Sequence, residues 1–145
     1  VDENRQTLVP GIFACGNVLH VHDLVDYVSK EAKTAGENAA EFVLGFWDKE
    51  ENGIEIKTGK GVRYTVPSTI RISRMDELQT IRFRVSDIYK NCFIIVSADG
   101  EELIRIKKQI VAPGEMEQII LKKQLLTDKG ISHEIRIELV TDKEG

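Results

Sequence analysis

Cysteine is scarce in this sequence, since only Cys15 and Cys92 occur among its 145 residues. Two cysteines cannot form a disulfide framework, and the absence of a Cys-x-x-Cys pair excludes the usual redox dithiol. Such sparing use of cysteine is typical of proteins in a reducing compartment. We therefore expect a cytoplasmic protein that does no thiol-disulfide chemistry with its own residues.

Long apolar runs and an excess of positive charge are also missing. The longest apolar stretches are short, such as Cys92–Val96, whereas a membrane-spanning helix needs roughly 20 consecutive apolar residues. The net charge of −4 gives no electrostatic support for binding nucleic acid. We expect neither a membrane span nor a nucleic-acid partner. The chain starts at Val1 without the apolar core of a signal peptide, so we expect it to be part of a longer polypeptide.

Charge and periodicity divide the chain near residue 45. Residues 1–45 hold 3 basic and 7 acidic side chains, whereas residues 46–145 hold 17 of each. The pattern of apolar residues changes at the same place, from helical spacing to alternation. We therefore predict two domains, 1–45 and 46–145.

The first domain is expected to contain a short strand, a loop and one long helix. The apolar run Ile12–Cys15 lies between two glycines and is typical of a buried strand. A helix is predicted from about residue 23 to 44, with Asp23 as its N-cap. Its apolar positions recur at intervals of three and four: Leu24, Val28, Ala32, Ala35, Ala39 and Val43. These elements are too few to bury a core of their own.

The second domain alternates apolar and polar residues in short segments, which predicts strands. The sequence Ala98-Asp99-Gly100 between two such segments predicts a hairpin. Many short strands at this spacing predict a mainly β fold, an antiparallel immunoglobulin-like β-sandwich. The predicted strands are 54–58, 62–66, 69–73, 80–85, 92–97, 102–109, 117–122 and 133–140.

The most specific motif runs from Thr7 to Asn17 and reads Thr-Leu-Val-Pro-Gly-Ile-Phe-Ala-Cys-Gly-Asn. With the long helix after it, this stretch resembles the C-terminal flavin-binding segment of FAD-dependent pyridine nucleotide-disulfide oxidoreductases. The thioredoxin-reductase-like branch is the most similar. The sequence around Asn17–Val25 also resembles that of oxidoreductases found with anaerobic-type glycerol-3-phosphate dehydrogenases. The resemblance covers residues 1–45, which would then be the tail of an FAD-binding α/β domain.

The resemblance implies three cofactor-binding residues, Gly16, Asn17 and Val18. Gly16 would let the backbone approach the flavin, because glycine has no Cβ. In the family an aspartate after this glycine accepts a hydrogen bond from the ribityl chain, and Asn17 can accept one through its amide oxygen. The Val18 amide would face the pyrimidine end of the flavin. The loop 19–23 is longer than in thioredoxin reductases.

The resemblance implies FAD and NAD(P)H as the cofactors of a larger parent enzyme. This chain has no Gly-x-Gly-x-x-Gly motif for either dinucleotide. We therefore expect it to be inactive by itself and unable to hold FAD. Its partners would be the N-terminal FAD and NAD(P) domains of the parent, a second copy in a homodimer, or a redox partner protein. Residues 46–145 would serve dimerisation or partner docking.

A non-enzymatic alternative remains open, in which a β-sandwich interaction module carries a helical arm. In that case the helix packs on its own sheet or on a neighbour's. A module that binds an unrelated small ligand is a third option, which no residue favours.

Several other residues permit a functional and a structural interpretation. His20 and His22 could ligate a metal or donate protons near the flavin, but no third and fourth ligand is evident, and a structural role in the loop is favoured. Cys15 is favoured as a small packing residue rather than a redox thiol.

Arg82 and Arg84 share one strand face and are the best place for an anion site. The pair Phe46-Trp47 is expected to plug the helix end onto the β-domain.

Overall fold

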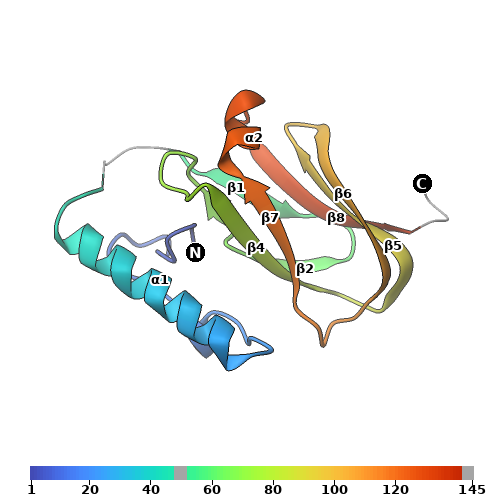
Figure 1. The fold of residues 1–145 in the computed structure, drawn as a ribbon, viewed down its shortest axis with the longest axis horizontal. Helices are drawn as coiled ribbons and strands as arrows, with labels where there is room; N and C mark the ends of the chain where they lie inside the picture. The colour runs from blue at the N-terminus through green and yellow to red at the C-terminus, as the bar shows by residue number, and fades with distance from the viewer. Residues whose placement is uncertain (48–51, 142–145) are drawn as a thin grey trace.

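A computed structural model describes residues 1–47 and 52–141 (Figure 1). Residues 1–45, the first predicted domain, contain a short 3-10 turn, η1 (Gly16–Val18), and the long helix α1 (Val25–Val43). All eight strands of the described residues lie in the second predicted domain, together with a short helix, α2 (Lys123–Asp128). The strands are β1 (Ile54–Thr58), β2 (Val62–Val66), β3 (Thr69–Ile70), β4 (Leu78–Val85), β5 (Tyr89–Ala98), β6 (Glu101–Val111), β7 (Glu117–Lys122) and β8 (Glu134–Thr141).

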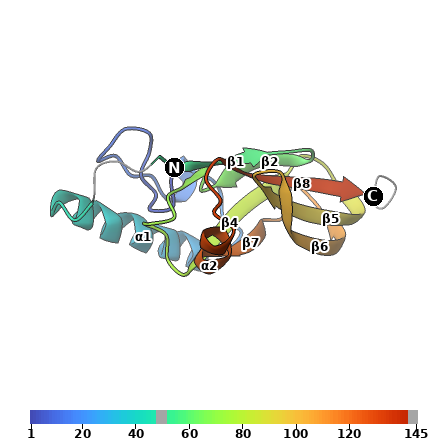
Figure 2. The ribbon, with the colours of Figure 1, turned by 90° about the horizontal axis from the view of Figure 1, so that it is seen from above.

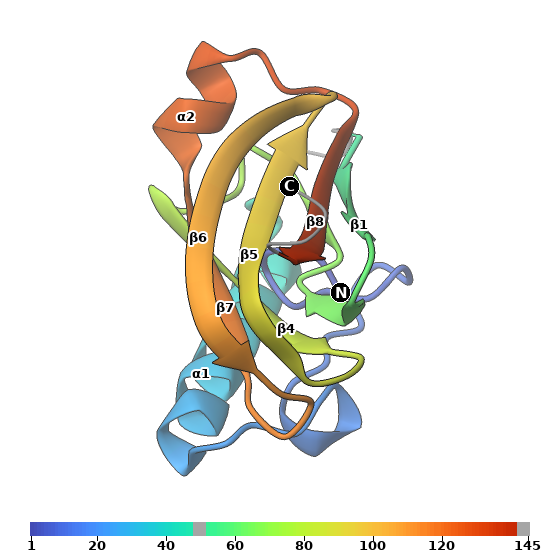
Figure 3. The same cartoon turned by 90° about the vertical axis from the view of Figure 1, so that its right-hand side faces the viewer.

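The strands form two sheets that enclose one apolar core. The larger sheet has the order β3-β1-β8-β5-β6, and the smaller one has the order β2-β4-β7. Figure 3 shows the β6-β5-β8-β1 layer in front, with β4 and β7 behind it. Alternate residues of each strand point into the space between the layers. The largest fully buried side chains come from both sheets and from α2, among them Phe83, Ile81, Leu121, Leu126, Ile94, Ile135, Ile137 and Leu139.

The mainly β prediction is confirmed, and eight strands lie where alternation predicted them. The segment predicted at 69–73 is shorter, because Arg71 turns the chain by accepting hydrogen bonds from the amides of Arg74 and Met75. The prediction that all pairing is antiparallel is wrong at one place, since β1 runs parallel to β8. Helix α2 was not predicted. It fills the end of the core with Leu126, which is fully buried.

The buried strand predicted at Ile12–Cys15 is wrong. This segment instead folds back on the preceding one through a single bridge between Gln6 and Phe13. Ile12 is exposed and Cys15 is only half-buried, because no sheet of the described residues covers this segment. The long helix is confirmed, but Asp23 is not its N-cap. Leu24 holds that place without a side-chain hydrogen bond.

The first domain lies beside the smaller sheet, with the N-terminal segment between α1 and the strands (Figures 1 and 2). Polar contacts join the two domains. Asp23 accepts hydrogen bonds from the Met116 amide and from Arg84, and Asp2 pairs with Arg71 at 2.8 Å. Within the described residues no helix is long and apolar enough to cross a membrane.

Candidate functional site

The loop from Gly16 to His22 carries every residue predicted to contact a cofactor. Gly16 has a φ of +66°, a left-handed conformation that favours glycine. It is buried, whereas Asn17 and Val18 of η1 are exposed on the surface, Val18 to 83%. The structure thus places Gly16, Asn17 and Val18 together in one tight turn, with its outer side accessible.

Behind this turn, Glu31 of α1 accepts four hydrogen bonds. Its Oε1 receives the Arg5 Nε at 3.2 Å and the His20 Nε2 at 3.0 Å. Its Oε2 receives the Gly16 amide at 3.0 Å and the His22 Nε2 at 2.9 Å. A carboxylate offers about four lone-pair positions, so each of them is used here. Glu31 therefore ties the N-terminal segment, the turn and the loop to α1.

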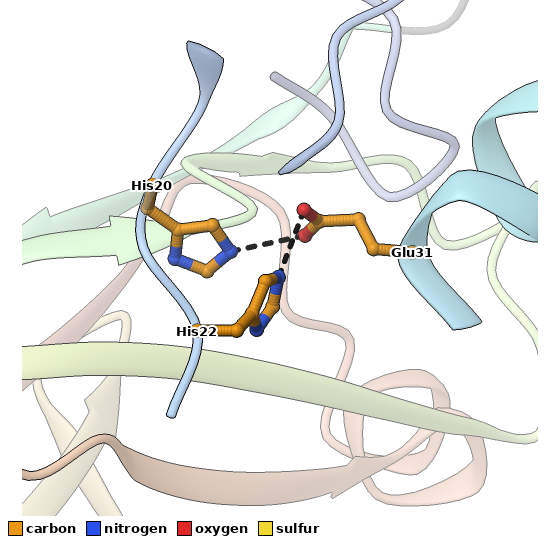
Figure 4. Close-up of side chains that lie close together, drawn as sticks. All are labelled: His20, His22 and Glu31. Carbon is orange, nitrogen blue, oxygen red and sulfur yellow. Dashed lines mark hydrogen bonds and ion pairs between the residues drawn. The ribbon is translucent and has the colours of Figure 1, made fainter. Parts of the chain in front are cut away.

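The two histidines come from one extended stretch, and their rings face the same carboxylate (Figure 4). Residues two apart in an extended chain point to the same side, which explains how His20 and His22 reach Glu31 together. Glu31 is 2% exposed and His20 is 7% exposed. The Nδ1 atoms of both histidines are buried and have no hydrogen-bond partner among the residues described.

The electrostatics of the cluster depend on the ionised form of Glu31. Burial by itself raises the pKa of this carboxyl, but the hydrogen bonds from His20, His22 and the Gly16 amide, together with the Arg5 charge, lower it to about 2. The guanidinium of Arg5 balances the carboxylate charge. This charge balance and the hydrogen bonds to both carboxylate oxygens offset the cost of burying Glu31.

A second buried acid, Glu3, predicts a pH dependence of stability. Burial and the neighbouring Asp2 raise the pKa of Glu3 to about 7. The pKa of a glutamate in the unfolded chain is near 4.3. The folded chain therefore keeps its full stability below pH 4.3 and loses part of it as the pH rises towards 7, because the unfolded chain releases the Glu3 proton more easily. The loss amounts to about 3 kcal/mol.

Replacing Glu3 by glutamine removes the ionisable group but keeps an oxygen for the Arg71 amide, which Glu3 Oε2 contacts at 3.0 Å. We expect urea unfolding of Glu3→Gln to show a flatter fall of stability between pH 4.5 and 7 than the parent chain. The exposed Glu115→Gln is the matched control. Parallel pH profiles of all three chains would contradict this account of Glu3.

The remaining predicted residues are dispersed. Cys92 is buried in the β-core and Cys15 is half-buried outside it, and no disulfide joins the two. Arg82 and Arg84 do not form a joint anion site, because Arg84 is bonded to Asp23, whereas the Arg82 guanidinium lies 5.1 Å from the Tyr27 ring centroid.

At the junction between the domains, the two aromatic residues differ. Trp47 packs edge-on against the rings of Phe13 and Phe42, at centroid distances of 5.7 and 5.6 Å. Arg74, which precedes β4, lies over the same indole. Phe46 is exposed. Of the two aromatic residues, Trp47 therefore makes the predicted contact between the helix end and the β-domain.

Sequence reasoning missed Glu31 and Arg5, which complete the cluster. A glutamate in the middle of a helix usually lies on the solvent side, so the residue type did not predict that Glu31 is buried. Its position did carry a weak signal, because Tyr27 and Ala35 are one turn before and after it and share its face. Arg5 had no such signal.

Comparison with known proteins adds no relative from which a role could be transferred. Neither protein-family models, nor curated proteins, nor solved structures give a match to this chain.

Proposed function

We propose that residues 1–45 are the C-terminal flavin-contacting segment of an FAD-dependent NAD(P)H oxidoreductase of the cytoplasm, and that residues 46–145 are its accessory domain. The observation that carries the proposal is the motif from Thr7 to Asn17, which ends in a left-handed Gly16. In this reading Gly16, Asn17 and Val18 face the flavin. The catalytic residues and the dinucleotide-binding glycines belong to the parent enzyme.

The distribution of apolar surface supports this proposal. Ten of the fourteen large apolar side chains that are exposed in the described residues belong to the stretch from residue 8 to 46. A soluble protein rarely leaves such a concentration of apolar side chains without a partner. The ten are Leu8, Val9, Ile12, Val18, Val21, Leu24, Val25, Val43, Leu44 and Phe46.

The helix has two sides of different character. Glu31 and Ala35 on one side are buried. On the rest of α1, Ala32, Gly36 and Ala40 are exposed, and a Cβ added at Gly36 would meet no atom within 4 Å. Small residues allow another backbone to approach a helix closely. We infer that the FAD-binding domain of the parent covers this side, together with the apolar residues of the loop 8–12.

The accessory domain would act in dimerisation or in docking a redox partner protein, as an immunoglobulin-like module. Its two sheets enclose an apolar core, and only four of the fourteen exposed large apolar side chains in the described residues lie after residue 46. It holds the first domain through the ion pairs of Asp2 and Asp23. It would thereby set the orientation of the flavin-contacting turn relative to the partner.

A glycine substitution in the complete gene product tests the assignment of the turn. We expect Gly16→Val to reduce the flavin content at least tenfold, because a β-branched residue at φ +66° distorts the turn and a side chain blocks the approach of the cofactor. Flavin is measured by visible absorption per mole of purified protein.

The matched control is Gly114→Val, in the exposed turn between β6 and β7, where an added Cβ meets no atom within 4 Å. Equal flavin contents in the parent protein and both variants would contradict a role of Gly16 at the cofactor.

One observation favours the non-enzymatic alternative, in which a helical arm packs on its own β-module. The first domain is joined to the second by several polar contacts, including the Arg84–Asp23 ion pair at 2.6 Å. On this alternative, the complete protein carries no flavin whatever residue stands at position 16. The two functions are therefore separated by the same absorption measurement.

A further inference from the structure

We propose that His20, His22 and Glu31 form a binding site for a first-row divalent transition metal, with Zn²⁺ as the reference ion. The proposal concerns this chain by itself and does not depend on flavin. From the sequence, a metal site at His20 and His22 was not favoured, because no third ligand was evident. In the structure, Glu31 of α1 lies beside both histidines and provides a third ligand.

The donor atoms converge as metal ligands do. One ring nitrogen of His20, one ring nitrogen of His22 and one Glu31 oxygen all lie within 4.8 Å of one another. The two nitrogen-to-oxygen distances are 3.0 and 2.9 Å. Ligands placed about 2.1 Å from one ion in tetrahedral geometry are about 3.4 Å apart. Each of the two nitrogen-to-oxygen distances therefore has to lengthen by only a few tenths of an ångström to reach the spacing of metal ligands.

The chemistry of the donors selects the class of metal. Imidazole nitrogen suits zinc, iron, cobalt, nickel and copper, whereas calcium and magnesium prefer oxygen ligands. Metal binding requires a free Nε2 on each ring, so the Nε2 proton moves to Nδ1 as the ion replaces the hydrogen bonds to Glu31. Both imidazoles stay neutral in this exchange, and each keeps one proton.

The surroundings of Glu31 fix its orientation for such a role. Arg5 and the Gly16 amide each hold one of the two oxygens by a hydrogen bond, in addition to the histidines. Outer contacts of this kind orient ligands at metal sites. Glu31 and Arg5 also line a cavity of about 170 Å³. This cavity reaches the Arg5 side of the Glu31 carboxylate, and His20 and His22 do not line it.

Two features limit the affinity. The Arg5 guanidinium already balances Glu31, so a bound ion adds two uncompensated positive charges. The Nδ1 atoms, which would carry the protons, are buried without a partner among the described residues. Sites that lack such second contacts bind metals 10- to 100-fold more weakly. We therefore expect a dissociation constant of about 1 to 10 µM, far weaker than that of a structural zinc site.

The test uses the 145-residue chain, freed of metal with a chelator and without a histidine tag. Co²⁺ is titrated while visible absorption is recorded, and Zn²⁺ is then added as a competitor. We expect saturation at one ion per chain, displacement by Zn²⁺, and no competition from Mg²⁺. His22→Gln, whose amide keeps a donor for Glu31, and Glu31→Gln should each weaken binding at least 100-fold.

His133→Gln is the matched control, because His133 is exposed and lies just before β8, outside the cluster. It should bind as the parent chain does. Circular dichroism shows whether each variant is folded, and a folded His22→Gln with unchanged affinity would overturn the proposal. The absence of a saturable cobalt spectrum in the parent chain would overturn it too, as would thiolate bands that place the ion at a cysteine.

Discussion

Replacing Glu31 by alanine is expected to destabilise the first domain by about 3 to 5 kcal/mol in metal-free solution. The substitution removes the acceptor of four hydrogen bonds in one place. It leaves the buried Arg5 guanidinium without its carboxylate and the buried Gly16 amide without its acceptor. A buried charge that has lost its partner is among the most costly defects in a folded protein.

Amide hydrogen exchange measures this effect region by region. In Glu31→Ala, the amides of α1 and of residues 1–22 should exchange faster by two to three orders of magnitude, whereas those of β4 and β5 should change little. Glu37→Ala is the matched control, because Glu37 lies on the same helix in an exposed pair with Lys33. It should cost less than about 0.5 kcal/mol. Equal effects of both substitutions would contradict the role assigned to Glu31.

Replacing Phe83 by alanine is expected to destabilise the β-domain by about 3 to 5 kcal/mol. The Phe83 side chain on β4 is fully buried between the two sheets. Its removal loses apolar contact and leaves a cavity that the neighbouring strands cannot close without strain. Urea unfolding followed by circular dichroism measures the change.

The control for Phe83 is Ile120→Ala, an apolar residue on the exposed side of the neighbouring strand β7. It should cost much less than Phe83→Ala.

The comparison with Glu31→Ala also tests the division at residue 45. If the two domains are separate units of stability, each substitution accelerates exchange in its own domain. A uniform acceleration across the chain by both substitutions would contradict that division.

The strands could be predicted because each has one buried and one exposed side. In β4, for example, Gln79, Ile81, Phe83 and Val85 are buried, and the residues between them are less so. Alternation reports that burial directly. It says nothing about which strands become neighbours, so the parallel pairing of β1 with β8 could not be predicted. Helix α2 is six residues long, too short for a helical period to stand out.

The first domain was harder to predict, because its contacts are polar and distant in sequence. The run Ile12–Cys15 has the composition of a buried strand, but no strand of the described residues lies beside it except at the bridge of Phe13 with Gln6. Asp23 occupies a position typical of an N-cap, but its carboxylate accepts hydrogen bonds from Arg84 and from the Met116 amide of the β-domain instead. The contact of Glu31 with Arg5 spans 26 residues, a separation at which no local pattern operates.

The central claim is that residues 1–45 belong to a flavoenzyme. Its most direct test is the visible absorption spectrum of the native protein, isolated from its source cells with antibodies raised against residues 54–141. The account predicts a flavin band, about one FAD for each copy of this chain, and bleaching of that band by NADH or NADPH. A native protein without flavin would contradict the account and favour a β-module with a helical arm.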